Sequence, residues 1–315
     1  MNFDRIIGHD NIKKQIEASI ESGKFAHAHL IIGEDGIGKS LLARGIGLKL
    51  LGKTVDREYA DLIEFRVPDN KQTIGIKYVV EEIIDEINKK PYEGDRKVII
   101  IYDAHKMTTD AQNAFLKTIE EPPKGVFILL LCEKLESILE TIRSRCQIHK
   151  LQRLNMNELQ QFLNIKYAHL NSKEVKTITS FSDGIPGRAE RFIEDDTFKE
   201  IRDTAIGVLL DIGTKSPREF LKYELFFTKH KNNWQEVLTW LLSYIRDVLV
   251  YKETGIEELI VNIDKANKIK DISSLFSFNR LNDIIEIVNE TRQRLERNVN
   301  PSLTFSNMLL KFLDT

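Results

Sequence analysis

The eight residues from Gly33 to Ser40 constrain this chain more than any other segment. They read Gly-Glu-Asp-Gly-Ile-Gly-Lys-Ser and fit the pattern G-x-x-x-x-G-K-[ST]. The backbone N–H groups of such a loop can curl around a β-phosphate, its lysine can reach β and γ oxygens, and its hydroxyl can bind Mg²⁺. The segment therefore predicts a phosphate-binding loop, or P-loop, for a purine nucleoside triphosphate.

The residues on either side of this loop provide the structural context that the motif requires. Residues 26–32 end in an apolar run that stops at Gly33, which is typical of a buried strand. Residues 40–51 carry leucine and isoleucine at helical spacing. A strand, a loop and a helix in this order make a chance match in an ordinary glycine turn the weaker interpretation.

Further apolar runs predict the rest of an α/β domain over residues 1–150. Their unbroken β-branched character suits a parallel sheet that is covered on both faces. Helical patterns at 78–89 and 110–120 lie between them, as in a doubly wound fold. The additional strand candidates are residues 62–67, 98–102, 126–132 and 147–151.

Beyond residue 151 only helical patterns remain. Residues 151–205 predict a small helical domain that is interrupted by a glycine- and proline-containing turn at 183–187. Residues 206–315 predict a second all-helical domain, because leucine, isoleucine and valine recur there every three or four residues.

Composition excludes several classes of protein. Of 315 residues, 42% are hydrophobic and 30% charged, which argues against disorder. There is no apolar run of about 18 residues and no signal-peptide pattern at the start, so we expect a cytoplasmic protein that crosses no membrane. A net charge of −2 gives no general attraction to nucleic acid. The only cysteines, Cys132 and Cys146, cannot form a four-cysteine zinc site.

Asp103 ends the apolar run at 98–102 and occupies the position of the acidic residue that holds Mg²⁺ in P-loop ATPases. Ser40 and Asp103 are thus the predicted magnesium residues. Many ATPases place a glutamate directly after this aspartate to polarise water, but here Ala104 follows. His105 could replace that base, although a histidine at the surface or at a helix start is the favoured interpretation.

Residues 103–123 resemble the AAA+ clamp-loader subunits of bacterial DNA polymerase III. The resemblance rests on Asp-Ala-His at the strand end, on Asn-Ala-Phe-Leu-Lys in the next helix and on Glu-Glu-Pro-Pro at its end. Residues 25–30, the triplet Ser144-Arg145-Cys146 and the segment 298–301 also resemble that family. In the family the triplet's arginine acts as an arginine finger on a neighbouring subunit's nucleotide, which implies that role for Arg145.

The resemblance implies an AAA+ domain at 1–150, a lid at 151–205 and an oligomerisation collar at 206–315. It also implies ATP or ADP with Mg²⁺ as ligand and a hetero-oligomeric ring with gamma/tau-type motor subunits and a delta subunit. That ring would act on a sliding clamp and on primer–template DNA. Arg188 lies near the family's second sensor arginine, and Cys132 falls where motor subunits have a sensor threonine. The predicted nucleotide contacts are Gly33, Gly36, Gly38, Lys39, Ser40, Leu41 and Asp103.

Three functions remain open on the sequence alone. The first is a stator that holds nucleotide without hydrolysing it, which Ala104 favours. The second is an ATP-hydrolysing motor subunit of the same machine; the absence of cysteines from residues 49–61, where many relatives carry zinc ligands, argues against it. The third is a stand-alone P-loop ATPase. For Arg145, an ion pair with a local carboxylate is the alternative to the finger role.

Overall fold

The computed structural model describes residue 3, residues 6–212, residue 220 and residues 222–314. Its contacts divide the chain into two compact units. One comprises residues 1–165 with 183–187, and the other residues 166–182 with 188–315. The predicted lid at 151–205 has residues in both units, and the boundaries at 150 and 205 remain predictions. Residues 213–219, 221 and 315 of the predicted collar lie outside the described residues.

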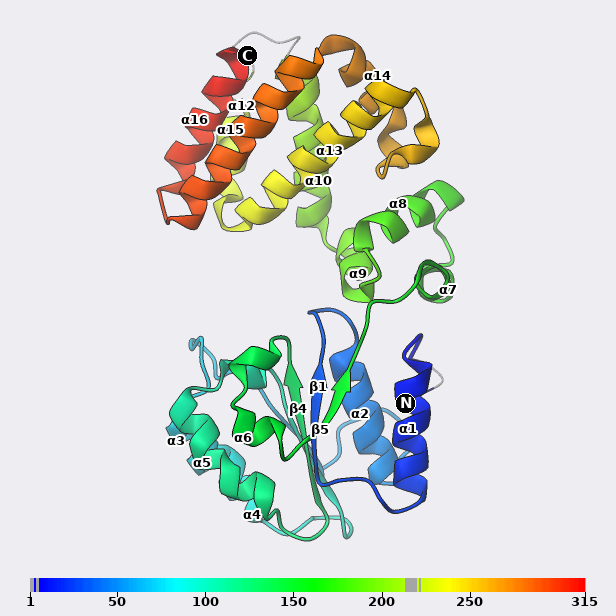
Figure 1. The fold of residues 1–315 in the computed structure, drawn as a ribbon, viewed down its shortest axis with the longest axis vertical. Coiled ribbons are helices and arrows are strands. Elements are labelled where there is room, and N and C mark those ends of the chain that lie inside the picture. The colour runs from blue at the N-terminus through cyan, green and yellow to red at the C-terminus, as the bar shows by residue number, and fades with distance from the viewer. Residues whose placement is uncertain (1–2, 4–5, 213–219, 221, 315) are drawn as a thin grey trace. The chain divides into compact units, whose positions relative to one another are not determined.

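The first unit is built on a five-stranded parallel sheet with the order β2-β3-β4-β1-β5 (Figure 1). This confirms the predicted parallel α/β fold. Every residue of β1 and β3 is buried, as expected for strands covered on both faces. The strands are β1 (Ala28–Ile32), β2 (Leu62–Phe65), β3 (Lys97–Ile101), β4 (Val126–Cys132) and β5 (Gln147–Lys150).

Helices cover both faces of this sheet (Figure 1), and each face has its own apolar core. Alternate residues of β3 take part in different cores, since Ile100 packs with Leu42 and Ile101 packs with Phe115. The helices are α1 (Asp10–Glu21), α2 (Lys39–Leu50), α3 (Ile76–Tyr78), α4 (Asp85–Asn88), α5 (Thr109–Glu120) and α6 (Glu140–Arg143), with a π-helical segment at Val79–Ile84 and 3₁₀ turns at Ala104–Lys106 and Leu135–Ser137.

The second unit is helical throughout its described part, which confirms the predicted helical C-terminal region. Its core surrounds α13, where Trp240, Leu241 and Tyr244 are fully buried. The helices that follow β5 are α7 (Met156–Lys166), α8 (Ser172–Ser182), α9 (Pro186–Glu194), α10 (Asp196–Ile212), α12 (Lys222–Lys229), α13 (Trp234–Thr254), α14 (Ala266–Leu275), α15 (Phe278–Glu296) and α16 (Pro301–Asp314), with 3₁₀ turns at Lys231–Asn233, Glu257–Leu259 and Ile263–Lys265.

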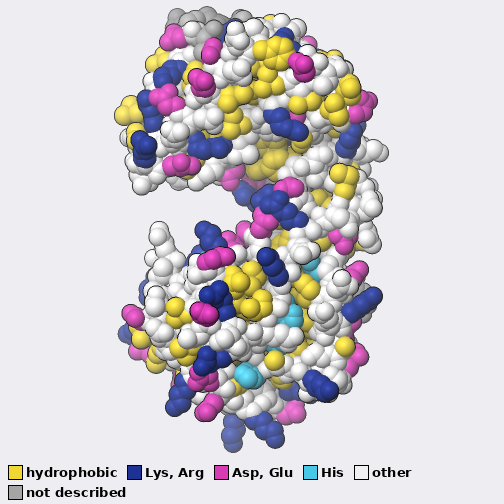
Figure 2. Space-filling model, viewed as in Figure 1, with side chains coloured by type: hydrophobic (Ala, Val, Ile, Leu, Met, Phe, Trp, Pro, Cys, Tyr) yellow, Lys and Arg dark blue, Asp and Glu magenta, His cyan; other side chains and the backbone are white. Residues whose placement is uncertain are grey.

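Basic and acidic side chains are interspersed over the visible face of both units (Figure 2). This agrees with the near-balance of 46 basic and 48 acidic residues. Within the described residues, no helix combines the length and the apolar character needed to cross a membrane.

Two buried histidines join β1 to β5. His29 donates its Nε2–H to the Ala26 carbonyl at 2.9 Å, so its Nδ1 accepts from His149 Nε2, also at 2.9 Å. The Phe25 ring stacks on His29 with centroids 3.8 Å apart. Burial, and then the neighbouring His149, lowers the pKa of His29 to about 3; burial also lowers the pKa of His149. Both rings are therefore neutral at pH 7.

We expect this pair to make the fold sensitive to acid. A histidine whose pKa is lowered by folding contributes stability that is present above pH 6.5 and is lost as the pH falls towards the folded pKa. For His29 the loss between pH 7 and pH 5 is about 2 kcal/mol. Urea unfolding should show that His29→Gln loses less stability than wild type between pH 7 and pH 5. His169 is exposed, so His169→Gln should lose as much as wild type. Equal pH slopes in wild type and His29→Gln would contradict this account.

Candidate nucleotide-binding site

The P-loop begins at the carboxyl end of β1, which lies between β4 and β5 in the sheet. Gly33 donates its N–H to the Cys132 carbonyl at 3.1 Å, which continues the β1–β4 pairing into the loop. A Cβ on Gly33 would lie 2.8 Å from Ile37 Cγ2, and Ile37 is buried in the core that contains Leu42 and Ile100. The loop is therefore anchored at its start by the sheet and at its middle by an apolar side chain.

The P-loop packs against the turn at 183–187 through Gly36. Gly36 has a φ of +77°, and a Cβ there would lie 2.9 Å from the Cα of Gly187. Gly187 donates its N–H to the Gly36 carbonyl at 2.9 Å. Arg153 adds an ion pair to Glu34 at 2.5 Å. The close backbone approach thus requires glycine at both positions, and the left-handed conformation favours it further at Gly36.

Gly38 starts α2 in a conformation suited to an anion site. Its φ is +106°, no atom lies within 4 Å of where its Cβ would be, and no side chain caps the helix. The first N–H groups of α2 thus have no capping side chain, and the helix dipole favours a negative ligand there. Ser40 is half-buried in this first turn, and Leu41 beside it is exposed.

Lys39 folds back over the loop and donates from Nζ to the carbonyls of Gly33 and Glu34, both at 2.8 Å. Burial lowers the pKa of this ammonium, while the carboxylates of Glu133 and Asp35 act in the opposite direction. The glycine backbone, the uncapped helix start and this lysine form a donor set that fits a polyphosphate.

Asp103 lies two residues beyond β3, with a left-handed φ of +50°. Strain of this kind in a non-glycine residue is found preferentially at functional sites. Its Oδ2 forms an ion pair with Lys106 Nζ at 3.0 Å, and the carboxylate is partly exposed. Ala104, which follows, is fully buried in the core that contains Phe115 of α5.

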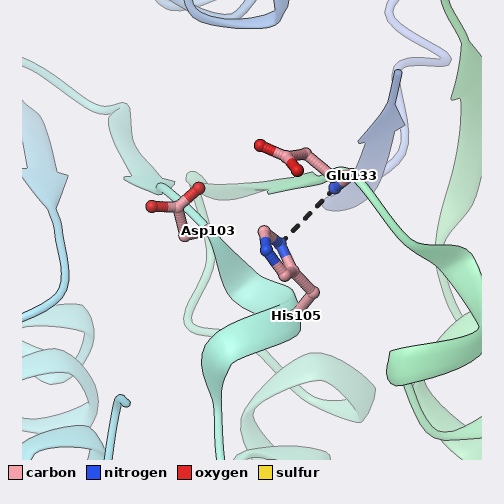
Figure 3. A group of neighbouring side chains, drawn as sticks. All are labelled: Asp103, His105 and Glu133. Carbon is pink, nitrogen blue, oxygen red and sulfur yellow. Dashed lines mark hydrogen bonds between the residues drawn. The ribbon is translucent and has the colours of Figure 1, made fainter. Parts of the chain in front are cut away.

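Glu133 is a site residue that the sequence analysis did not identify. It follows β4 directly, and its carboxylate lies close to the carboxylate of Asp103 and the ring of His105 (Figure 3). One potential ligand atom from each of the three residues lies within 4.8 Å of the other two. The Glu133 N–H donates to His105 Nδ1 at 3.4 Å. Burial lowers the pKa of His105, against the opposing effect of Asp103 and Glu133. Among the described residues this is the only group of three that could hold a metal ion.

The two cysteines are both free thiols within the described structure. Cys132 is fully buried and donates from Sγ to the Lys134 carbonyl at 3.0 Å. Burial raises the pKa of Cys132 to about 11 and that of Cys146 to about 12. Both are therefore protonated thiols at neutral pH.

Arg145 follows α6 and is held by its own chain. Its Nε forms a 2.6 Å ion pair with Glu120 Oε1, and it donates to the Thr141 carbonyl at 2.9 Å. The side chain remains 39% exposed. The local ion pair that was the alternative to a finger role is thus present. Arg188 belongs to the second unit, beside Trp240 in a cavity of about 180 Å³.

Two family models match most of the chain between them. The model described as DNA polymerase III, delta subunit, matches residues 8–155, and the model of the C-terminal part of that subunit matches residues 197–314. The delta′ subunits of Escherichia coli and Bacillus subtilis are 24% and 25% identical over 95% of this chain, covering 92% and 94% of their own lengths. The chain belongs to the family of DNA polymerase III clamp-loader subunits.

Other members of this family are longer. The tau subunit of Bacillus subtilis is 23% identical over 99% of this chain, but the match spans only 62% of tau. A gamma subunit from Buchnera aphidicola is 32% identical over 58% of this chain and 55% of its own length. The fold is also similar to the Thermotoga maritima RuvB Holliday junction branch migration motor, with a TM-score of 0.51 and 16% identity over 99% of this chain and 89% of that protein. Membership of the family favours the two clamp-loader functions over a stand-alone P-loop ATPase.

The contact between Gly36 and Gly187 can be tested by adding a single methyl group. Gly36→Ala must accommodate both a positive φ and the backbone of Gly187, whereas Gly52→Ala meets only the positive φ, +65°, in open space. We expect Gly52→Ala to lower the free energy of unfolding by about 1 kcal/mol and Gly36→Ala to lower it further. Urea denaturation of the two variants measures the difference. Equal effects would show that the close approach does not restrict the loop.

Proposed function

We propose that the chain is a delta′-type stator of the clamp loader, which holds ATP or ADP with Mg²⁺ without hydrolysing it. The observation that carries the proposal is the pairing of a complete P-loop with Ala104. This alanine is fully buried directly after Asp103, where a hydrolytic site needs a carboxylate. Bound nucleotide would then stabilise the protein, rather than supply energy through its hydrolysis.

Each residue of the site has a defined part in this proposal. The loop backbone and the start of α2 would donate to the phosphates, and Lys39 would leave the Gly33 carbonyl to bind them. Ser40 and Asp103 would hold Mg²⁺, which neutralises phosphate charge. The residues proposed to bind nucleotide are Gly33, Gly36, Gly38, Lys39, Ser40, Leu41 and Asp103.

The catalytic contribution of the chain would be Arg145, acting in trans on the nucleotide of an adjacent motor subunit. Its ion pair with Glu120 joins two partly exposed groups, and such pairs contribute about 0–1 kcal/mol. Arg145 can therefore leave Glu120 and bind a phosphate of the neighbouring subunit at little cost in free energy. The planar guanidinium can then make two hydrogen bonds to phosphate oxygens.

Assembly would place the chain in a cytoplasmic ring with gamma/tau-type motor subunits and a delta subunit. Residues 206–315 would serve as the collar that joins the ring. This is supported by the match of residues 197–314 to the model of the C-terminal part of delta. The assembled complex, rather than this chain alone, would engage the sliding clamp and primer–template DNA.

A motor subunit is the second candidate, because tau and gamma subunits are among the relatives. Two observations argue against it. Ala104 removes the water-polarising carboxylate, and residues 49–61 lack the cysteines that many motor subunits use for zinc. A motor subunit should hydrolyse ATP alone, whereas a stator should not.

We expect the isolated chain to bind Mg·ATP or Mg·ADP and to turn over ATP far more slowly than about 1 s⁻¹, the slow end for enzymes. Lys39→Ala should abolish nucleotide binding in calorimetry, because the phosphates lose the ammonium group that binds them. Lys49→Ala is the matched control: it lies on the same helix but pairs with Glu17. Unchanged affinity in Lys39→Ala, or rapid turnover by wild type, would refute the proposal.

We expect Arg145→Ala to fold and to assemble, but to abolish hydrolysis at the motor site that it faces. Arginine fingers contribute about 10³–10⁵ in rate in GTPase systems. Clamp loading by the reconstituted complex should therefore fail, whereas total ATPase should fall only in part. Arg145→Lys should restore little of the clamp-loading activity, since an ammonium lacks the planar guanidinium that can bind two phosphate oxygens.

Glu120→Gln is the control for this experiment, because it removes the ion pair and leaves the arginine in place. Complexes with Glu120→Gln should load clamps. Equal loading by wild type and Arg145→Ala would contradict the finger role, and equal failure of Glu120→Gln and Arg145→Ala would assign the loss to the ion pair instead.

A further inference from the structure

The edge of the sheet where the P-loop begins carries a carboxylate, Glu133, that the P-loop motif does not include. β1 and β4 pair in register through Ile32 and Cys132, and the Gly33 N–H extends that pairing. Glu133 therefore leaves the sheet beside the first residue of the loop. Figure 3 shows its side chain on the same side as Asp103, above the ring of His105.

Most of the charged side chains around Lys39 are acidic. Asp103 has an ion pair with Lys106 at 3.0 Å, but Glu133 forms no ion pair within the described residues. Glu133 is also the carboxylate with the largest electrostatic effect on Lys39, ahead of Asp35 and Asp103. The lysine of the loop thus already interacts with an acidic neighbour before any phosphate binds.

We propose that Glu133 makes this site selective for a nucleoside diphosphate over a nucleoside triphosphate. The inference rests on the proposed nucleotide-binding function. A P-loop lysine reaches both β and γ oxygens, so a third phosphate adds negative charge near Lys39. Lys39 is held on the Gly33 carbonyl, beside the end of β4 that Glu133 follows. At the dielectric of a protein surface, two like charges at close range repel enough to change affinity about tenfold or more.

Neither Cys132 nor His105 offsets this repulsion. The residue before Glu133 is Cys132, whose thiol is a weak donor and already donates to the Lys134 carbonyl. His105 accepts the Glu133 N–H at Nδ1, which leaves its ring neutral in that arrangement. Neither residue brings a positive charge to a γ-phosphate.

The test is calorimetry of the full chain with Mg·ADP and with the Mg²⁺ complex of a non-hydrolysable ATP analogue. Wild type should bind ADP at least about tenfold more tightly than the analogue. Glu133→Gln keeps the size of the side chain and removes its charge, so it should reduce that ratio at least about fivefold, mainly by tighter analogue binding. Glu136→Gln is the matched control, because Glu136 is exposed in the next turn.

The outcomes separate the two proposals. If neither nucleotide binds to a folded wild-type chain, the nucleotide-binding function fails and the selectivity fails with it. If both bind and Glu133→Gln leaves the ratio unchanged, only the selectivity is overturned. If Glu133→Gln weakens analogue binding instead, the carboxylate assists Mg²⁺ rather than repelling phosphate, which also overturns the selectivity.

Discussion

The placement of β1 inside the parallel sheet, between β4 and β5, is the constraint on which the rest of the site depends. Because the carboxyl ends of parallel strands meet at one edge, β1 delivers Gly33 to the same place where β4 delivers Glu133 and where Asp103 follows β3. Both faces of β1 are buried, so the strand cannot shift without disrupting two cores. The rigidity of the loop therefore comes from the sheet beneath it.

That edge holds two carboxylates, Asp103 and Glu133, but none directly follows Asp103, where a hydrolytic site has its base. Ala104 is buried in the core that contains Phe115, in place of a glutamate, while Glu133 provides a carboxylate from a different strand. In the proposed function, the site combines groups that bind phosphate with one carboxylate, Glu133, that opposes the third phosphate. A protein of this kind would retain nucleotide as a structural element, and its contribution to the chemistry would be Arg145, on another part of the same unit.

Local patterns predicted the five strands, the loop and most helices, because β-branched runs and helical spacing are properties of short segments. Glu133 escaped notice because its role depends on the sheet order, which places β4 beside β1 although about a hundred residues separate them. The His29–His149 hydrogen bond depends on the same kind of long-range pairing. The ion pair of Arg145 was foreseen only as an alternative, since no local pattern identifies Glu120 as its partner. The site residues stay predictions that ligand binding must test.

The proposed stator holds nucleotide without hydrolysing it. The decisive measurement is the ATPase of a reconstituted complex in which the P-loop lysine of every motor protein is inactivated and this chain is unchanged. We expect such a complex to have no steady-state ATPase, while filter retention still detects nucleotide bound through Lys39. Residual ATPase that disappears on Lys39→Ala would contradict the stator function, because the remaining turnover would then come from this chain.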